Sequence, residues 1–92
     1  MEAEVLGMRS EINGLVEMVE LRTDIPKSAL KLLQMHKKWF IESVAEWREA
    51  ESDEVCSSMC KDEVRTTHKK YINTLMKTLG LPVEEEPLDL RV

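Results

Sequence analysis

Two cysteines and two histidines are the side chains of this sequence best suited to bind a metal ion. Cys56 and Cys60 are four positions apart, so both sulfurs would lie on one face of a helix. A zinc ion needs two further ligands, but His36 and His68 are expected about 12 Å away along a helical hairpin, at about 1.5 Å per residue. We therefore expect no metal site and two small, buried, reduced thiols, with redox sensing or an intermolecular disulfide as the alternative.

The two histidines could also change charge near neutral pH. Folding residues 26–79 as a helical hairpin about Glu51 and Ser52 places His36 level with His68. One hypothesis is a paired, pH-sensitive contact between the two rings. The simpler hypothesis is two histidines that are hydrogen-bonded to neighbours at the edge of the core.

Residue patterns typical of enzymes are not found in the sequence. It contains no glycine-rich phosphate loop, no nucleophile elbow and no metal-binding His-Glu-x-x-His run. Its many carboxylates fall on helix faces expected to be solvated, where their acidity is not perturbed for catalysis. The sequence predicts a protein that is not an enzyme and that carries no cofactor.

The elements that position these side chains are predicted to be helices. Apolar residues recur at spacings of three and four, and no alternating run of strand type occurs among the 92 residues. The periodic segments span about residues 2–22, 26–50 and 53–79. Because short connections favour antiparallel neighbours, we predict an all-α, antiparallel, up-down-up three-helix bundle with long helices over residues 1–81. A flexible, disordered acidic tail is expected over residues 82–92.

Local signals mark the ends of these helices. Pro26 suits the first turn of the second helix, where its missing N–H costs nothing. At the end of the third helix, Gly80 stands where a left-handed residue closes a helix, and Pro82 follows it. Leu81 is then expected to fold back towards Met76.

The predicted helices carry more apolar surface than three helices need to cover one another. A glycine inside a helix costs about 1 kcal/mol relative to alanine, but it lets another helix approach closely. We expect two stripes to contact a partner helix or a second copy of the chain, although tolerated glycines and ordinary core residues are the alternatives. The first stripe is Gly7, Gly14, Met18 and Leu21, and the second is Leu32, Met35 and Trp39.

Charge is distributed in blocks of alternating sign, which sum to a formal net charge of −5. An acidic total disfavours a dedicated nucleic-acid binder, since phosphate contacts need a basic surface. One basic stripe is nevertheless present on the third helix, and it indicates a solvated face, contact with an acidic partner or with the chain's own acidic residues at 84–86, or contact with nucleic acid. This stripe consists of Lys61, Arg65, Lys69 and Lys70.

The acidic tail contains one suggestive string. Residues Pro87, Leu88, Asp89 and Leu90 resemble the Pro-x-Asp-Leu core of the short peptide that C-terminal-binding-protein corepressors bind. The resemblance implies a corepressor partner and a role in transcription regulation. The next residue, Arg91, departs from the Ser or Thr usual in that motif. An apolar-x-apolar terminus of the kind that PDZ domains bind, and a tail without a binding role, are the alternatives.

Together these patterns predict a non-enzymatic protein–protein interaction module or adaptor. Its partner is expected to be another, helical protein, or a second copy in a homodimer. The alternatives are a nucleic-acid-associated helical protein that uses the basic stripe, and a structural homodimer. No apolar run approaches the ~20 residues that span a bilayer, so we expect no membrane partner and an intracellular location, in the cytoplasm or nucleus.

Overall fold

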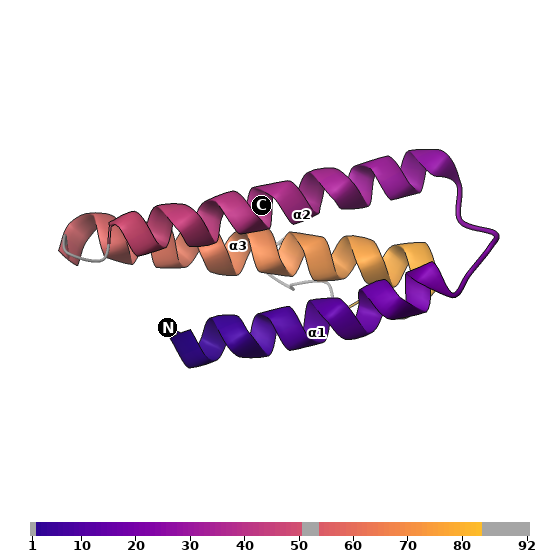
Figure 1. Ribbon diagram of the computed structural model, residues 1–92, viewed down its shortest axis with the longest axis horizontal. Helices are drawn as coiled ribbons and strands as arrows, with labels where there is room; N and C mark the ends of the chain where they lie inside the picture. Colours follow the sequence, from indigo (N-terminus) through magenta and orange to yellow (C-terminus); the bar gives the residue numbers. More distant parts are fainter. Residues whose placement is uncertain (1, 51–53, 84–92) are drawn as a thin grey trace, which may run out of the picture.

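A computed structural model describes residues 2–50 and 54–83 of the chain. It contains three helices, α1 (Glu2–Glu20), α2 (Lys27–Glu49) and α3 (Glu54–Leu79). Consecutive helices run in opposite directions, so α1 and α3 are parallel (Figure 1). The predicted all-α, up-down-up three-helix bundle is confirmed. Residues 84–92, most of the expected tail, lie outside the described residues.

Helix boundaries differ little from those expected. α1 ends at Glu20, two residues early, because the Arg22 N–H bonds to the Val19 carbonyl oxygen at 3.1 Å and tightens the last turn. Pro26 lies directly before α2, with an extended backbone (φ −63°, ψ 149°). Its fixed φ suits this position, and its missing N–H would have had no partner in the helix.

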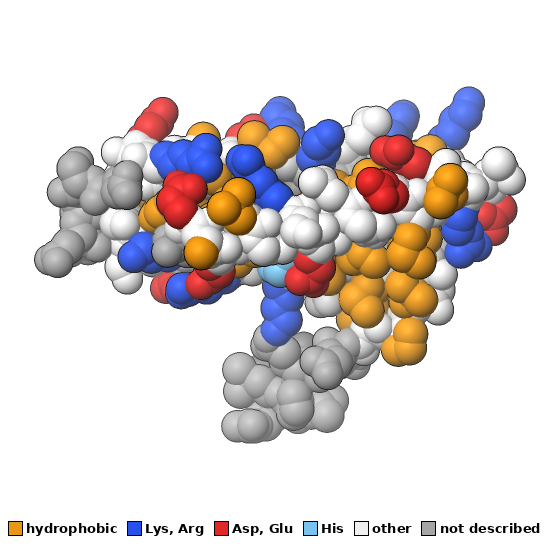
Figure 2. All heavy atoms as spheres, turned by 60° about the horizontal axis from the view of Figure 1, so that its bottom comes forward, with side chains coloured by type: hydrophobic (Ala, Val, Ile, Leu, Met, Phe, Trp, Pro, Cys, Tyr) orange, Lys and Arg blue, Asp and Glu red, His pale blue; other side chains and the backbone are white. Residues whose placement is uncertain are grey.

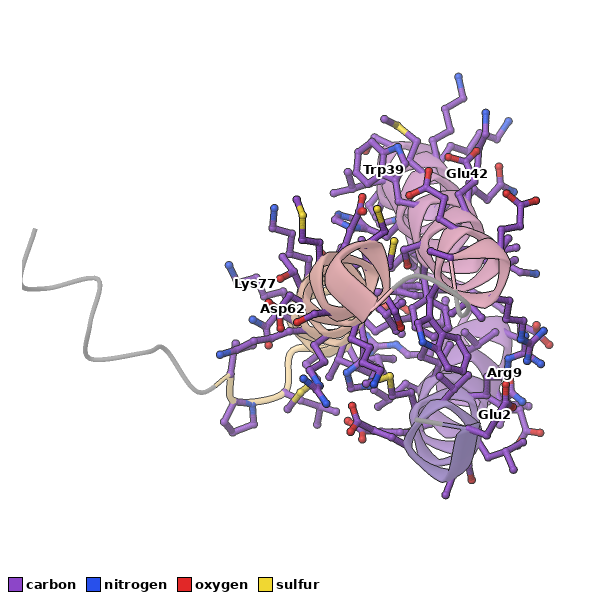
Figure 3. The ribbon with its side chains drawn as sticks, turned by 90° about the vertical axis from the view of Figure 1, so that its left-hand side faces the viewer. Glu2, Arg9, Trp39, Glu42, Asp62 and Lys77 are labelled. Atoms are coloured by element: carbon purple, nitrogen blue, oxygen red, sulfur yellow. The ribbon has the colours of Figure 1, made fainter. Side chains whose placement is uncertain are left out.

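Helix α3 packs against both other helices, whereas α1 and α2 touch each other only weakly. Viewed end-on, the three helices form a triangle with the wider gap between α1 and α2 (Figure 3). The buried apolar side chains come from the seams expected from the helical spacing. They are Val5, Met8, Ile12 and Val19 of α1, Leu33, Phe40, Val44 and Trp47 of α2, and Val64, Tyr71, Ile72, Leu75 and Leu79 of α3.

A pair of hydroxyls, one buried and one half-buried, joins α2 to α3 at the margin of this core. Ser43 is only 2% exposed, and its Oγ lies 2.8 Å from Thr67 Oγ1. Each hydroxyl is also close to a carbonyl of its own helix, that of Phe40 at 2.7 Å and that of Val64 at 3.0 Å. One hydroxyl donates across the interface while the other donates to its own helix, so both oxygens are satisfied.

The C-terminal end of α3 has the geometry that its sequence predicts. Gly80 has a φ of +74°, the Leu81 N–H bonds to the Met76 carbonyl oxygen at 2.8 Å, and the Gly80 N–H bonds to that of Lys77 at 3.1 Å. These are the two bonds of a Schellman motif. Arg22 adds a long-range bond to the Leu79 carbonyl oxygen at 3.2 Å. The α1–α2 connection is thereby tied to the end of α3.

Candidate partner-binding surfaces

Helix α2 leaves much of its apolar surface uncovered. Five of the nine large apolar side chains that are exposed in the described part of the chain belong to it. They fall on both flanks of its buried seam, because one face of α2 packs on α3 and its contact with α1 is weak. The five residues are Leu30, Leu32, Met35, Trp39 and Ile41.

The predicted stripe Leu32, Met35 and Trp39 forms one of these flanks. The three residues are 44%, 48% and 44% exposed, so the stripe is surface and not core. Figure 3 shows Trp39 and Glu42 on the same outer part of α2. Because Glu42 follows Trp39 by three positions and Glu46 follows by seven, carboxylates continue the stripe along the helix.

A groove of about 210 Å³ between α2 and α3 includes Trp39, the last residue of this stripe. Trp39, Glu42 and Glu46 line it from α2, and Glu63 and Lys70 line it from α3. Three carboxylates and one lysine line the groove, which gives it acidic character, and Glu42 also pairs with Lys38 of α2 at 3.9 Å. None of these glutamates was predicted as a site residue, although Glu42 and Glu46, three and seven positions after Trp39, continue the helical spacing of the stripe.

An aromatic stack holds Trp39 in place. The His36 ring meets Trp39 edge-on at 5.2 Å between centroids, and it stacks on Tyr71 at 6.4 Å with an interplanar angle of 13°. His36 Nε2 also lies 3.3 Å from Thr74 Oγ1. Burial, and then the charge of Lys70, lower the pKa of His36, so the neutral ring is favoured. A positioned tryptophan is a suitable anchor for a partner.

The stripe on α1 is exposed as well. A Cβ added at Gly7 or Gly14 would meet no atom within 4 Å, so neither glycine serves close packing inside this chain. Met18 is 45% exposed and Leu21 is 85% exposed. Figure 2 shows hydrophobic side chains gathered over the C-terminal end of α1 and the residues that follow α3.

The hypothesis of a paired contact between His36 and His68 is wrong, because the two rings have different neighbours. His68 packs near Phe40, at 6.2 Å between ring centroids, and its Nε2 lies 3.9 Å from Glu11 Oε2 of α1. The two histidines therefore lie on different flanks of α3. The register differs because the first turns of α3 extend beyond the end of α2, whereas the prediction assumed flush helix ends (Figure 1).

The two cysteines differ in exposure. Cys56 is exposed and Cys60 is half-buried, so the expectation of two buried thiols is wrong for Cys56. Cys56 lies in the first turn of α3, and Cys60 packs against the core as a partly buried residue. No group of three histidine, cysteine or acidic side chains in the described residues could hold a metal ion.

The basic stripe of α3 is partly neutralised within the chain. Arg65 donates two hydrogen bonds to Glu4, from Nε to Oε2 at 2.8 Å and from Nη2 to Oε1 at 3.2 Å. Asp62 lies 3.7 Å from the same guanidinium. The Glu4 contact lowers the pKa of that carboxyl and raises the pKa of Arg65. Lys61 is half-buried, Lys69 and Lys70 are exposed, and Lys70 faces the α2–α3 groove.

The tail string Pro87, Leu88, Asp89 and Leu90 lies outside the described residues. None of the helices described is long and apolar enough to cross a membrane. The chain matches no protein-family model, and comparison with curated proteins and with solved structures finds no significant similarity.

Proposed function

We propose that this chain is a non-enzymatic protein–protein interaction module that docks an amphipathic helix of a partner on α2. The observation that carries the proposal is the uncovered stripe Leu32, Met35 and Trp39, whose last residue lines a groove between α2 and α3. Apolar residues at these spacings meet the matching residues of a second helix. Methionine and tryptophan supply an adaptable surface and a rigid anchor.

The charges beside the stripe select the partner's chemistry. Glu42, Glu46 and Glu63 would face the border of a docked helix, where lysine or arginine side chains complement them. The partner is therefore a helix with an apolar face and a basic flank. Apolar burial supplies most of the binding free energy, and the carboxylates orient the helix.

A pair of synthetic peptides of about 18 residues, long enough to form an isolated helix, tests this proposal. Both carry leucines at helical spacing, and the remaining positions are lysine in one peptide and glutamate in the other. In a Trp47→Phe background, Trp39 is the single tryptophan, so its emission reports on the stripe. The lysine peptide is expected to shift this emission to the blue as it binds.

Met35→Lys is the matched test substitution, because it removes an apolar contact and adds a repelling charge. We expect it to weaken binding of the lysine peptide at least tenfold, with an unchanged circular dichroism spectrum. Ala45→Lys adds the same charge at another exposed position of α2 and should leave binding unchanged. Equal binding to the parent chain and to the Met35→Lys variant would show that the stripe is not the docking surface.

A homodimer is a second candidate, favoured by the exposed stripe of α1. The open space beside Gly7 and Gly14 would let the α1 helix of another copy approach closely. Sedimentation velocity at two concentrations measures the association. If α1 forms the interface, Gly7→Lys and Gly14→Lys should abolish it while the helical circular dichroism is retained. Concentration-independent sedimentation of the parent chain would exclude this candidate.

A further inference from the structure

A second groove lies on the other flank of α2, between α2 and α1. Its volume is about 300 Å³, and it is separate from the stripe of Leu32, Met35 and Trp39. Ile12, Phe40 and Tyr71 are buried at its floor, and half-buried Val16 and exposed Ile41 form its apolar walls. The groove follows from the packing of α1 on α3, which leaves α1 and α2 in weak contact.

The charged side chains lining this groove are both cations. Arg9 borders it from α1 and Lys37 borders it from α2, and both are exposed. Among the described residues neither side chain forms an ion pair. Figure 3 shows Arg9 on the flank of α1 away from α3. By contrast, Arg48 at the end of the same interface is paired with Glu2 at 3.5 Å. Arg9 and Lys37 thus offer two positive charges on either side of an apolar floor.

From this arrangement we infer that the α1–α2 groove binds an acidic amphipathic helix of a partner protein. The partner's apolar side chains would pack on Phe40, Tyr71 and Ile41, and its carboxylates would pair with Arg9 and Lys37 on opposite rims. A helix seated there would turn the three-helix bundle into a four-helix arrangement, with α1 and α2 as its neighbours. The charge preference is opposite to that proposed for the α2–α3 groove, so one chain would hold two helices of different chemistry.

The experiment uses the full chain and the same two synthetic peptides, now labelled and followed by fluorescence anisotropy. The glutamate peptide is expected to bind, and more weakly as salt rises, since its contacts with the two rims are screened. The double variant Arg9→Glu/Lys37→Glu should lose at least tenfold in affinity for the glutamate peptide. Lys31→Glu, at an exposed position away from this groove, is the control for net charge and should change affinity little.

Substitution of the apolar wall gives an independent readout. Ile41→Ser should lower the affinity for the glutamate peptide at least threefold without changing the salt dependence of binding. It should leave the lysine peptide unaffected, because Ile41 lies on the other flank of α2 from Met35. If the glutamate peptide binds and the lysine peptide does not, the result counts against the proposed function but not against this inference.

Three results would overturn the inference. The first is equal affinity of the glutamate peptide for the parent chain and the double variant. The second is no binding of that peptide, as expected if the chain's own acidic residues at 84–86 already fill the groove. The third is a concentration-dependent dimer that Arg9→Glu/Lys37→Glu dissociates, which would identify the occupant as a second copy.

Discussion

The α2–α3 hairpin and helix α1 are held in the bundle by different means. Between α2 and α3, the interface combines stacked rings with the buried contact between Ser43 and Thr67. Two polar links of α1 to the other helices, Glu4 with Arg65 and Glu2 with Arg48, are exposed pairs of the kind that contribute little to stability. A third joins Glu11 to His68 at 3.9 Å and is an ion pair only when the histidine is protonated. The hairpin therefore has a specified register, and α1 is docked on it mainly by apolar burial.

The uneven packing of the helices also explains why exposed apolar surface lies on both flanks of α2. Helix α3 lies against both neighbours and has little apolar surface left, since Met59 is its one large exposed apolar side chain among the described residues. Helices α1 and α2 meet weakly, so each keeps an apolar flank. The uncovered surface is a consequence of uneven packing. Substitutions in the α2–α3 hairpin and in α1 should therefore have different effects on stability.

The largest effect is expected at Leu75, which is fully buried where α3 supports the core. Leu75→Ala should lower the free energy of unfolding by about 2–5 kcal/mol, because it removes apolar burial and leaves a cavity. Urea denaturation followed by circular dichroism measures the loss. Leu30→Ala, at a residue that is 39% exposed, is the control and should cost far less. Equal costs at the two positions would contradict the described core.

A smaller loss is expected when the register contact of the hairpin is removed. Ser43→Ala should lower the free energy of unfolding by about 1 kcal/mol, the usual net value of one hydrogen bond. Thr67 keeps its bond to the Val64 carbonyl, so it is not left unsatisfied. Hydrogen exchange should show the added opening in α2 and α3 more than in α1. Faster exchange confined to α1 would reverse the proposed roles of the two regions.

On α1, a substitution is expected to stabilise the chain. Gly14→Ala adds a Cβ in open space at a helical position, and should raise the free energy of unfolding by up to about 1 kcal/mol. Gly80→Ala is the opposite case, since a φ of +74° strains any residue with a side chain. Thermal melts of both variants check the prediction. A destabilised Gly14→Ala variant would show that α1 is packed more tightly than described.

The smallest effect on stability is expected when the pH is lowered and His68, at the α1–α3 contact, becomes protonated. Burial lowers the pKa of His68 below its ordinary value of 6.5, while Glu11 and Glu4 oppose the shift. The folded state then binds fewer protons than the unfolded state, so stability is complete above about pH 6.5 and falls as the pH drops through that value.

The pH prediction is checked by comparing urea midpoints at about pH 7 and about pH 5.5. His68→Gln should reduce the difference between them. His36→Gln should reduce it independently, because burial and Lys70 lower the pKa of His36 at the separate α2–α3 contact. Non-additive effects of the two substitutions would indicate a coupling that the geometry does not show.

Much of the fold could be predicted because residues close in sequence determine the buried face and the ends of each helix. Apolar spacing identified the buried seams, and Gly80 with Pro82 identified the end of α3. Axial register could not be predicted, since helical periodicity gives the face of a residue but not its level along a neighbour. For this reason His36 was wrongly predicted to lie level with His68.

The candidate surfaces were predictable only in part. The stripe of Leu32, Met35 and Trp39 is visible as a pattern, but the spacing does not say which flank of α2 the other helices leave exposed. The groove lined by Arg9 and Lys37 brings together residues that are far apart in the sequence. No pattern within one segment of the sequence predicts that these residues line the same groove.

The packing of α1 on α3 has a consequence for synthesis of the protein. A ribosome makes α1 first, but the helix against which α1 mainly packs is the last of the three to emerge. The contacts between α2 and α3 are closer in sequence, so this hairpin can close as soon as α3 is complete. The helix translated first is thus expected to be the last to reach its place, and its apolar side faces water until then.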